Sequence, residues 1–366
     1  NRTVMGLQCG IIGLAGVGKT TLFNCLSSSR ARAGGGGSKS NLGMIYVPDD
    51  RLQKIDALIK SARIVPTTVD IVDIPGLVRG AGKGEGVGSK FLADIRNTDA
   101  LIHVLRCFDE PSVPHVESSI DPVRDIEMVE LELIVRDLES IEKKLQRLEK
   151  QAKSGDREAR TGIEVLEVYK HHLEDFLPAR TAPVGKEFQR YLTDLFLLSA
   201  KPVMYVCNVD DDSAITGNAY SNAVRDFFDD QNVEILTIAG KLESEIAELD
   251  DPADRRAFLE EVGLNEPGVN KLIQSAYRLL NLQTFFTAGP KEVRAWTIRK
   301  GITAPEAAGV IHSDLERGFI RAEVMKYDDF IRLGSEHACR EAGKLFIEGK
   351  NYVVQDGDIL HIRFNV

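Results

Sequence analysis

Short apolar runs alternate with longer stretches of helical spacing in the first part of this 366-residue chain. Runs with the length of a buried strand lie at 7–13, 68–73, 100–105, 202–207 and 233–238. Helical spacing follows the first run almost directly, from Thr20 to Leu26. Strands that are separated by helix-length connections are typical of a parallel, doubly wound sheet. The pattern therefore predicts an α/β fold for this part of the chain.

The pattern changes between the third and fourth apolar runs. Apolar residues there follow the 3-4 spacing of a coiled-coil seam, with charged residues between them: Leu131, Ile134, Leu138, Ile141, Leu145, Leu148 and Ala152. A turn at 153–156 precedes a second stretch of helical spacing through Leu166, Tyr169, Leu173 and Phe176. We predict a protruding antiparallel hairpin, with an ordinary pair of surface helices as the alternative.

From about Leu282 onward the pattern is one of short strands and turns. Strands are expected at 292–298, 318–324, 352–354 and 359–364. Residues 282–366 contain 12 Lys+Arg and 12 Asp+Glu, so this segment is neutral although the whole chain has a net charge of −10. Three parts are therefore predicted: an α/β domain at 5–118 and 195–281, a helical coiled-coil insertion at 119–194, and a small mixed α+β domain at 282–366.

The composition limits the expected partners and compartment. A net charge of −10 argues against non-specific wrapping of nucleic acid, so DNA is not expected as a partner. The longest apolar runs are too short to cross a bilayer, and no charged leader precedes an apolar stretch, so no membrane role is expected. The scattered cysteines favour free thiols in a reducing cytosol, hence a cytoplasmic protein: Cys9, Cys25, Cys107, Cys207 and Cys339.

A G-x-x-x-x-G-K-[ST] motif lies between the first predicted strand and the first predicted helix. Its glycines let backbone N–H groups surround phosphate oxygens, Lys19 neutralises charge on the β- and γ-phosphates, and the Thr20 hydroxyl holds Mg²⁺. A chance match in a glycine-rich turn is the alternative, but the strand before the motif and the helix after it favour phosphate binding. The predicted nucleotide-binding residues are Gly13, Leu14, Ala15, Gly16, Val17, Gly18, Lys19, Thr20 and Thr21.

A D-x-x-G motif, Asp73 to Gly76, ends the second predicted strand. In GTPase-like sites the aspartate binds Mg²⁺ through water and the glycine N–H contacts the γ-phosphate, so Thr20 and Asp73 are the predicted metal ligands. Leu77 stands where Ras-like enzymes have the glutamine that orients the attacking water. The hydrolytic group must therefore lie elsewhere, or the basal rate is very low. Five glycines between 80 and 88 predict a mobile switch.

The base-reading region is expected after the fourth and fifth strands. A guanine reader has N-K-x-D, in which the lysine stem packs along the base and the carboxylate accepts from guanine N1 and N2. This chain has Asn208-Val209-Asp210-Asp211, so guanine selectivity is in doubt. Ala239 and Gly240 follow the fifth strand, where a backbone amide usually completes the base pocket.

These segments together resemble the YchF family, the Obg-like ATPases of the translation-factor class of P-loop GTPases. The resemblance rests on residues 72–88, on Arg106 and Phe108 through His115, and on 243–249 and 285–297. It continues through 318–324 and the Asp356-Gly-Asp358 turn. The match runs from about Leu7 to Val366 and thus covers nearly the whole chain.

The resemblance implies a nucleotide domain, an inserted coiled coil and a C-terminal TGS domain. It also implies ATP as the preferred substrate over GTP, because the family's base-reading motif is N-x-x-E. Phe108, Asn208 and Val209 match positions that hold the adenine, and His115 matches a histidine implicated in hydrolysis. By itself, a lone loop histidine is more often only solvated. Ribosome association in the family makes the ribosome or structured RNA the expected partner.

The sequence departs from the family pattern in four places. Ala15-Gly16 replaces Pro-Asn, which removes an asparagine side chain linked to monovalent-cation binding. Asp211 stands where the family has glutamate. A glycine run at 34–37 replaces the aromatic-and-threonine stretch of the first switch. No threonine lies between Thr21 and Thr67, so the second hydroxyl ligand of Mg²⁺ has no candidate.

We therefore expect a P-loop ATPase that requires Mg²⁺, hydrolyses the β-γ phosphoanhydride of ATP and less readily of GTP, and uses His115 as its catalytic residue. A different class of protein, a nucleotide-gated binding adaptor with negligible turnover, is favoured by Leu77. A true GTPase is the further alternative, because Asp211 supplies the carboxylate that guanine requires.

Basic and aromatic residues near the C-terminal strands form the expected RNA surface, because phosphate contacts and base stacking need both: Lys291, Arg294, Trp296, Arg299, Lys300, Arg317, Phe319 and Arg321. The alternative is that the aromatics belong to the core and the charges to a solvated face.

Overall fold

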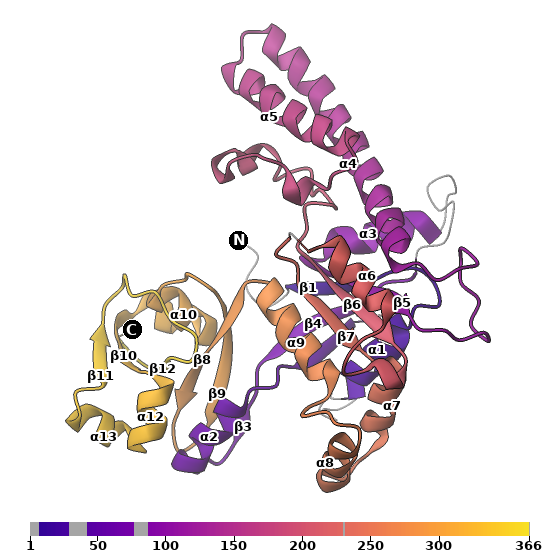
Figure 1. Ribbon diagram of the computed structural model, residues 1–366. Coiled ribbons are helices and arrows are strands. Elements are labelled where there is room, and N and C mark those ends of the chain that lie inside the picture. The colour runs from indigo at the N-terminus through magenta and orange to yellow at the C-terminus, as the bar shows by residue number, and fades with distance from the viewer. Residues whose placement is uncertain (1–6, 29–41, 77–86, 230, 366) are drawn as a thin grey trace.

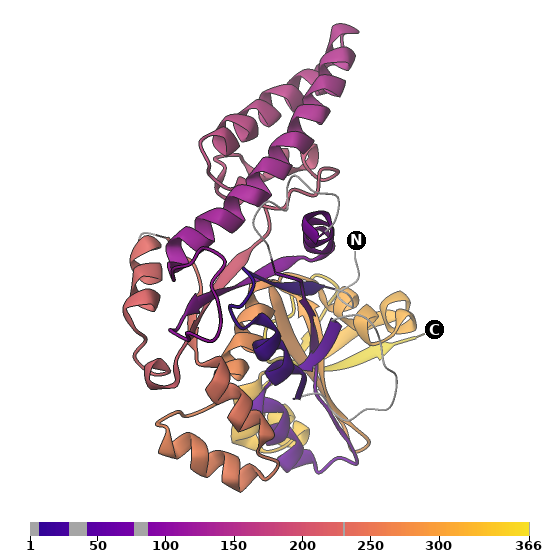
Figure 2. The same cartoon turned by 90° about the vertical axis from the view of Figure 1, so that its right-hand side faces the viewer.

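The structure is a computed structural model that describes residues 7–28, 42–76, 87–229 and 231–365. The expectations for the glycine run at 34–37, for Leu77 and for residues 80–86 lie outside these ranges. Two six-stranded sheets lie side by side, and a long helical hairpin projects from the first of them (Figures 1 and 2). The α/β class, the inserted hairpin and the C-terminal α+β domain are therefore confirmed.

The first sheet has the strand order β2-β4-β1-β5-β6-β7. Its strands are β1 (Gln8–Ile12), β2 (Leu42–Tyr46), β4 (Thr68–Asp73), β5 (Ala100–Cys107), β6 (Val203–Val209) and β7 (Ile235–Ile238). All five apolar runs predicted as strands are confirmed, and they pair in parallel. β2 pairs antiparallel with β4 and was not predicted. Its exposed Leu42 and Met44 obscure any alternation of apolar and polar residues.

The helices of this part of the chain pack in two groups. α1 contacts α7 and α9, whereas α6 contacts the first turns of the hairpin helix α4. Their bounds are α1 (Lys19–Ser28), α3 (Val87–Asn97), α6 (Ala219–Phe227), α7 (Gly240–Glu248), α8 (Pro252–Glu261) and α9 (Gly268–Leu279). β5 has all eight residues buried, as expected of a central strand covered on both faces.

The register of the parallel strands brings several loops to one edge of the sheet. Ile11 of β1 is paired with Asp73 of β4, and Cys107 of β5 with Val209 of β6. β1 has β4 on one side and β5 on the other, so the chain changes direction across the sheet at β1. Ligands of open α/β sheets bind beyond the carboxyl ends of the strands at such a point. The loops that follow β1, β4, β5 and β6 therefore surround one place.

The hairpin consists of α4 (Pro122–Lys153) and α5 (Arg157–Glu174), joined by a turn in which Gly155 has a φ of +94°. The predicted seam is confirmed from Ile134 to Leu148. Its buried side chains on α4 are Ile134, Ile141 and Leu145, and they pack with Leu166, Tyr169 and Leu173 of α5. In the described ranges, no helix is both long enough and apolar enough to cross a membrane.

Two residues assigned to the seam are wrongly placed by the spacing. Leu131 is 44% exposed and Phe176 is 72% exposed. The first turns of α4 pack on the sheet through Val129 and Leu133, so the helix turns a different face inward there than along the hairpin. Phe176 lies beyond the last residue of α5. The segment after α5 includes two 3-10 helices, η2 (Ala179–Thr181) and η3 (Lys186–Tyr191), and a third, η4 (Asp211–Ser213), follows β6.

The second sheet has the order β11-β10-β12-β8-β9-β3. Its strands are β3 (Ile64–Val65), β8 (Leu282–Ala288), β9 (Val293–Arg299), β10 (Phe319–Met325), β11 (Leu345–Glu348) and β12 (Ile359–Phe364). Short helices connect them: α10 (Ala304–Ile311), α11 (Ser313–Arg317), α12 (Tyr327–Leu333) and α13 (Glu336–Glu341). The strand expected at 352–354 is wrong, because only Val353 makes an isolated bridge, to Thr303.

An N-terminal segment completes the second sheet. After β2 the chain forms α2 (Asp50–Ile59) and β3, and β3 pairs in parallel with β9. Leu52 and Ile55 of α2 are buried in the same cluster as Phe286 and Val293. The chain thus crosses to the C-terminal sheet and returns at β4, which ties the two sheets together. The predicted domain boundaries, which assign 5–118 to one domain, stay a prediction.

Replacing Ile55 with alanine is expected to lower the free energy of unfolding of the C-terminal sheet by about 2–5 kcal/mol, because the side chain is fully buried. Urea unfolding followed by the fluorescence of Trp296, the single tryptophan of the chain, measures the change. Leu58→Ala on the same helix is the matched control, since Leu58 is 40% exposed. Equal effects of the two substitutions would contradict this packing.

Candidate nucleotide site

The loop after β1 has the conformation that the phosphate-binding motif requires. Gly16 and Gly18 have φ angles of +78° and +94°, in the left-handed region that favours glycine. A Cβ at Gly18 would lie 2.2 Å from Nδ2 of Asn208, so this residue of β6 leaves no room for a side chain. α1 begins directly afterwards at Lys19. The backbone N–H groups of the loop and the helix N-terminus therefore share one place.

Lys19 is buried at the start of α1, where it is 7% exposed. Its Nζ donates a hydrogen bond to the Leu14 carbonyl at 2.6 Å. Burial lowers the pKa of Lys19 to about 8, although the Asp73 carboxylate acts in the opposite direction. The loop thus holds a desolvated ammonium group that an anionic ligand would stabilise.

Thr20 and Asp73 meet beside this lysine. The Thr20 hydroxyl donates to Oδ2 of Asp73 at 3.0 Å. Burial raises the pKa of Asp73, while the Thr20 hydrogen bond and the Lys19 charge partly offset the effect. A Cβ at Gly76 would lie 2.8 Å from the Lys19 Nζ and 3.0 Å from the Ala15 N atom. The two sequence motifs are therefore in direct contact, as their spacing along the chain predicts.

Asn208 connects the glycine loop to the base-reading region. Its Nδ2 donates to the Val17 carbonyl at 2.9 Å, and its Oδ1 accepts from the Gly240 N–H at 2.9 Å. Val209 and Ala239 are buried in one core cluster. The structure thus places Asn208, Val209, Ala239 and Gly240 together. In this arrangement Asn208 braces two loops, and the Val209 side chain faces the core.

Asp211, the carboxylate offered for base reading, is paired with Lys241. Its Oδ2 lies 3.5 Å from the Lys241 Nζ, and its Oδ1 is buried without a hydrogen-bond partner among the described residues. The sequence reasoning did not find this pair, although Lys241 directly follows the predicted Ala239 and Gly240. Because the Lys241 side chain is 78% exposed, the pair is weak and makes Asp211 only a slightly poorer acceptor for guanine N1 and N2.

Arg106 organises the loop that carries Phe108, and sequence reasoning did not identify this role. The buried guanidinium donates to the carbonyls of Phe108 (3.2 Å), Glu110 (3.0 Å) and Val113 (2.7 Å). Its Cζ also lies 4.8 Å from the centre of the Phe108 ring. A Cβ at Gly16 would lie 3.3 Å from Cγ1 of Val113, so this loop lies against the glycine loop.

His115 lies in the same loop, with its side chain only 4% exposed. Its Nε2 is 2.9 Å from Oδ2 of Asp125, and its Nδ1 accepts from the Glu117 N–H at 3.1 Å. Because Nδ1 is the acceptor, Nε2 must carry the proton that is donated to Asp125. The loop thus lies at the expected edge of the sheet, but the ring itself is held against α4.

A second buried histidine near the site, His103, is unsuited to proton transfer. Burial lowers its pKa to about 3, and the charges of Lys19 and Arg180 act in the same direction. Its ring centre lies 5.5 Å from that of Tyr205, and neither ring nitrogen has a partner in the described parts of the chain. His103 is therefore a neutral ring of the sheet interior.

Comparisons with known proteins decide the family. Residues 282–365 match the YchF-GTPase_C family, described as a protein of unknown function, and residues 8–158 match the MMR_HSR1 family, described as a 50S ribosome-binding GTPase. Proteins named ribosome-binding ATPase YchF from Bacillus subtilis and Haemophilus influenzae are 46% and 47% identical over 99% of this chain and 100% of their own length. The chain belongs to the YchF family.

The solved YchF GTPase of Schizosaccharomyces pombe has the same fold. It aligns with a TM-score of 0.87 at 32% identity, and the alignment covers 98% of both chains. The resemblance that the motifs indicated is therefore confirmed, together with the fold class that it implied. The roles of individual residues in this YchF chain are a separate question, which its geometry addresses.

The proposed RNA surface of this YchF chain needs one correction. Phe319 is 5% exposed and belongs to the core of the C-terminal sheet, so it is not available for stacking on a base. Trp296 is half-buried, its Nε1 donates to Thr287, and the Arg294 guanidinium lies 4.0 Å from its ring centre. The spacing of residues along β10 could not distinguish a core phenylalanine from an exposed one.

An acidic cluster on the same sheet is a poor metal site. Glu323, Glu336 and His361 bring three potential ligand atoms within 4.8 Å of one another. Glu323, however, accepts hydrogen bonds from Arg363, and Arg340 also pairs with it. Because these guanidinium groups already neutralise the carboxylates, the cluster is an ion-pair network. Thr20 and Asp73 remain the better candidates for a cation.

We expect the affinity of this YchF chain for a nucleoside triphosphate to fall as the pH rises above about 8. Phosphates raise the pKa of Lys19 from its lowered value, so binding above pH 8 requires uptake of a proton, and the dissociation constant rises by up to about tenfold per pH unit. Titrations between pH 7 and 10 measure the slope. Lys19→Arg is the control, because arginine does not titrate in this range; the same slope in that variant would contradict the assignment.

Proposed function

We propose that the chain binds and hydrolyses ATP, and less readily GTP, in the cytoplasm as a nucleotide switch associated with the ribosome. The observation that carries the proposal is the contact of the two phosphate-site motifs. The buried Lys19 lies in the glycine loop, and Thr20 is bonded to Asp73 beside it. Residues 13–21 and Gly76 bind the phosphates, with Lys19 as the cation that neutralises them.

Magnesium fits the residues present. Thr20 and Asp73 offer a hydroxyl and a carboxylate oxygen, the hard ligands that Mg²⁺ prefers, and they lie 3.0 Å apart. Burial disfavours the charge of Asp73, so a cation there would stabilise the carboxylate. When bound, Mg²⁺ neutralises charge that develops on the β- and γ-phosphates during transfer. Thr20 and Asp73 would hold it.

The base end of the site favours ATP. Val209 replaces the lysine of a guanine reader, and its side chain is buried in the core. Asp211 retains a carboxylate, but Lys241 pairs with it at 3.5 Å. Adenine lacks the N1 and N2 donors that guanine directs at such a carboxylate, so it loses nothing to this pair. Phe108, whose ring lies 4.8 Å from the Arg106 guanidinium in the loop that also contacts the glycine loop through Val113, supplies an aromatic face for the base.

Hydrolysis is assigned to His115, which positions the attacking water. The loop of His115 follows β5 and lies against the glycine loop. The second candidate function is a nucleotide-gated adaptor with very slow turnover. One observation favours it: both ring nitrogens of His115 are bonded to other groups of the protein.

Ribosome association is proposed from the relatives and from the shape of the chain. The bacterial relatives carry the name ribosome-binding ATPase. The hairpin α4–α5 projects from the nucleotide-binding part, where a large partner can reach it (Figure 1). Exposed basic residues of the C-terminal part, such as Lys291 and Lys300, are available for phosphate contacts. Neither DNA nor a membrane is proposed as a partner.

We expect ATP to bind more tightly than GTP. Titration with labelled ATP and GTP in the presence of Mg²⁺ measures the two affinities.

The substitution His115→Ala is expected to lower the rate of single-turnover hydrolysis by about 100-fold or more, while nucleotide affinity stays nearly unchanged. Rapid-quench assays measure this rate. Exposed His337 provides a control, as His337→Ala should have no effect. Tighter GTP binding would show a true GTPase, and wild-type hydrolysis in His115→Ala would remove that residue from the mechanism.

The protein is expected to sediment with ribosomes, and binding should weaken as the salt concentration rises, because counterions compete with basic side chains. Charge reversal at Lys291 and Lys300 together should weaken it further. Reversal at Arg256 of α8, whose side chain is 80% exposed and lies on the nucleotide-binding part of the chain, is the control. No sedimentation in any nucleotide state would contradict the assigned partner.

A further inference from the structure

The ring of His115 has no nitrogen left for water or phosphate. Nε2–H donates to the Asp125 carboxylate, and Nδ1 accepts from the Glu117 N–H. The side chain is 4% exposed, and that of Asp125 is 2% exposed. A residue that positions water must offer a free donor or acceptor to it. His115 therefore cannot act in this position, although its loop lies at the nucleotide site.

Asp125 belongs to the first turn of the hairpin helix α4. Asp121 caps that helix by accepting from the Arg124 N–H. Arg124 then donates to Oδ1 of Asp125 at 3.0 Å and to the Ser119 carbonyl at 2.8 Å. The loop that carries His115 is thus fastened to the base of α4 at two places. The hydrogen bond from His115 to the Asp125 carboxylate has a charged acceptor, and such bonds are stronger than hydrogen bonds between neutral groups.

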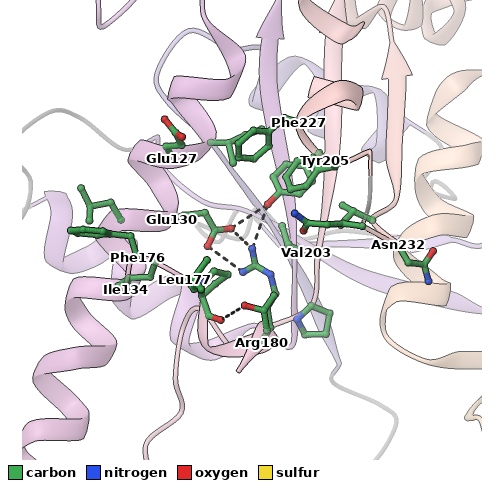
Figure 3. A pocket seen from close by; sticks show the side chains of 18 of the residues that line it. Glu127, Glu130, Ile134, Phe176, Leu177, Arg180, Val203, Tyr205, Phe227 and Asn232 are labelled. Carbon is green, nitrogen blue, oxygen red and sulfur yellow. Dashed lines mark hydrogen bonds and ion pairs between the residues drawn. The ribbon is translucent and has the colours of Figure 1, made fainter. Parts of the chain in front are cut away.

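The base of α4 packs on the sheet through Val129 and Leu133, whereas its other side borders an open space. A cavity of about 1130 Å³ lies between α4, the segment after α5 and the end of α6. Figure 3 shows Glu130 of α4 in this cavity, where it binds Arg180 and Tyr205. Leu131 and Phe176, which the seam does not bury, also line it. Open space on this side leaves room for the helix to shift.

α4 connects the projecting hairpin to the carboxylate that holds His115. The helix has 32 residues and extends over about 48 Å at 1.5 Å per residue. Asp125 is in its first turn, whereas its other end forms the projecting hairpin with α5 (Figure 2). A tilt of the projecting end would therefore move the carboxylate that holds the histidine.

We propose that Asp125 is a positioning residue that holds His115 out of its hydrolytic position until a displacement of the base of α4 releases the ring. This inference rests on the proposed hydrolytic role of His115. The hairpin then has a second role besides contact with a partner. A partner that tilts α4 releases His115 and thereby raises the rate of hydrolysis. A low rate of hydrolysis by the protein without its partner is the expected consequence of the same contact.

The first test is single-turnover ATP hydrolysis by the full chain. Asp125→Ala should raise the rate by about tenfold or more, because the ring loses its charged partner and keeps only the Glu117 bond. Asp125→Asn, which keeps the shape and one acceptor, should give a smaller increase. The affinity for ATP should stay unchanged in both variants. A lower rate in both variants would overturn the proposal, since it would mean that Asp125 supports catalysis by His115.

Val129→Ala is the matched control, because Val129 is also buried in α4, one turn further on. It should leave the rate unchanged. An increase equal to that of Asp125→Ala would mean that loosening α4 is sufficient, and the specific role of Asp125 would be excluded. The double variant Asp125→Ala, His115→Ala should lose the gain, and persistence of the gain would also exclude the proposal.

A second measurement is independent of hydrolysis. Diethyl pyrocarbonate modifies accessible imidazoles, and mass spectrometry follows each histidine separately. His115 should react far more slowly than His337, whose side chain is 79% exposed, and Asp125→Ala should raise the rate of His115 alone. Equal rates for both histidines in the unmodified protein would overturn the proposal. If His115→Ala keeps wild-type hydrolysis while the protection is observed, the hydrolytic role of His115 fails, and the proposal that Asp125 restrains it fails as well, although the contact itself stands.

Discussion

The parallel register of β4, β1, β5 and β6 is the constraint on which the site depends. These strands pair so that Ile11 lies opposite Asp73 and Cys107 opposite Val209. Their carboxyl ends therefore meet at one edge, and four loops that are far apart in the sequence come into contact. The glycine loop, the Asp73 motif, the His115 loop and the Asn208 brace all depend on this alignment. A shift of one strand by one residue would turn its side chains to the opposite face and separate these groups.

Burial of charged groups at the nucleotide site costs free energy of desolvation, and a bound nucleotide would offset that cost. Burial lowers the pKa of Lys19 to about 8 and raises that of Asp73, so each charge is disfavoured where it stands. Hydrogen bonds to Leu14 and Thr20 compensate in part. Phosphates beside Lys19 and a cation beside Asp73 would stabilise both charges further. The fold thus brings the binding groups together in advance, and binding requires Lys19 to exchange the Leu14 carbonyl for phosphate oxygens.

The sequence was a reliable guide where local patterns determine the structure. Apolar runs identified five strands of the first sheet, and heptad spacing identified the hairpin. The two motifs predicted a phosphate site at Lys19 and Asp73, and the fold brings these motifs into contact. Contacts between distant segments were not accessible in the same way. No periodic pattern in the sequence indicates that α2 and β3 join the second sheet. The same is true of the hydrogen bond between His115 and Asp125.

The errors have the same origin. Spacing showed that Leu131 and Phe319 occupy a helix and a strand, but it could not show which face another element covers. Leu131 is exposed because the inward face of α4 changes where the helix leaves the sheet, and Phe319 is buried because the C-terminal core closes over it. The Asp211 and Lys241 pair likewise joins two loops whose proximity follows only from the register of β6 and β7.

The central claim is that the edge formed by β1, β4, β5 and β6 binds the nucleotide, and a crystal structure with Mg²⁺ and a non-hydrolysable ATP analogue tests it most directly. We predict triphosphate density along residues 13–20, with the Lys19 Nζ on phosphate oxygens in place of the Leu14 carbonyl and the adenine on the side of Phe108 and Asn208. Nucleotide density at another place, with Lys19 still bonded to Leu14, would contradict the account.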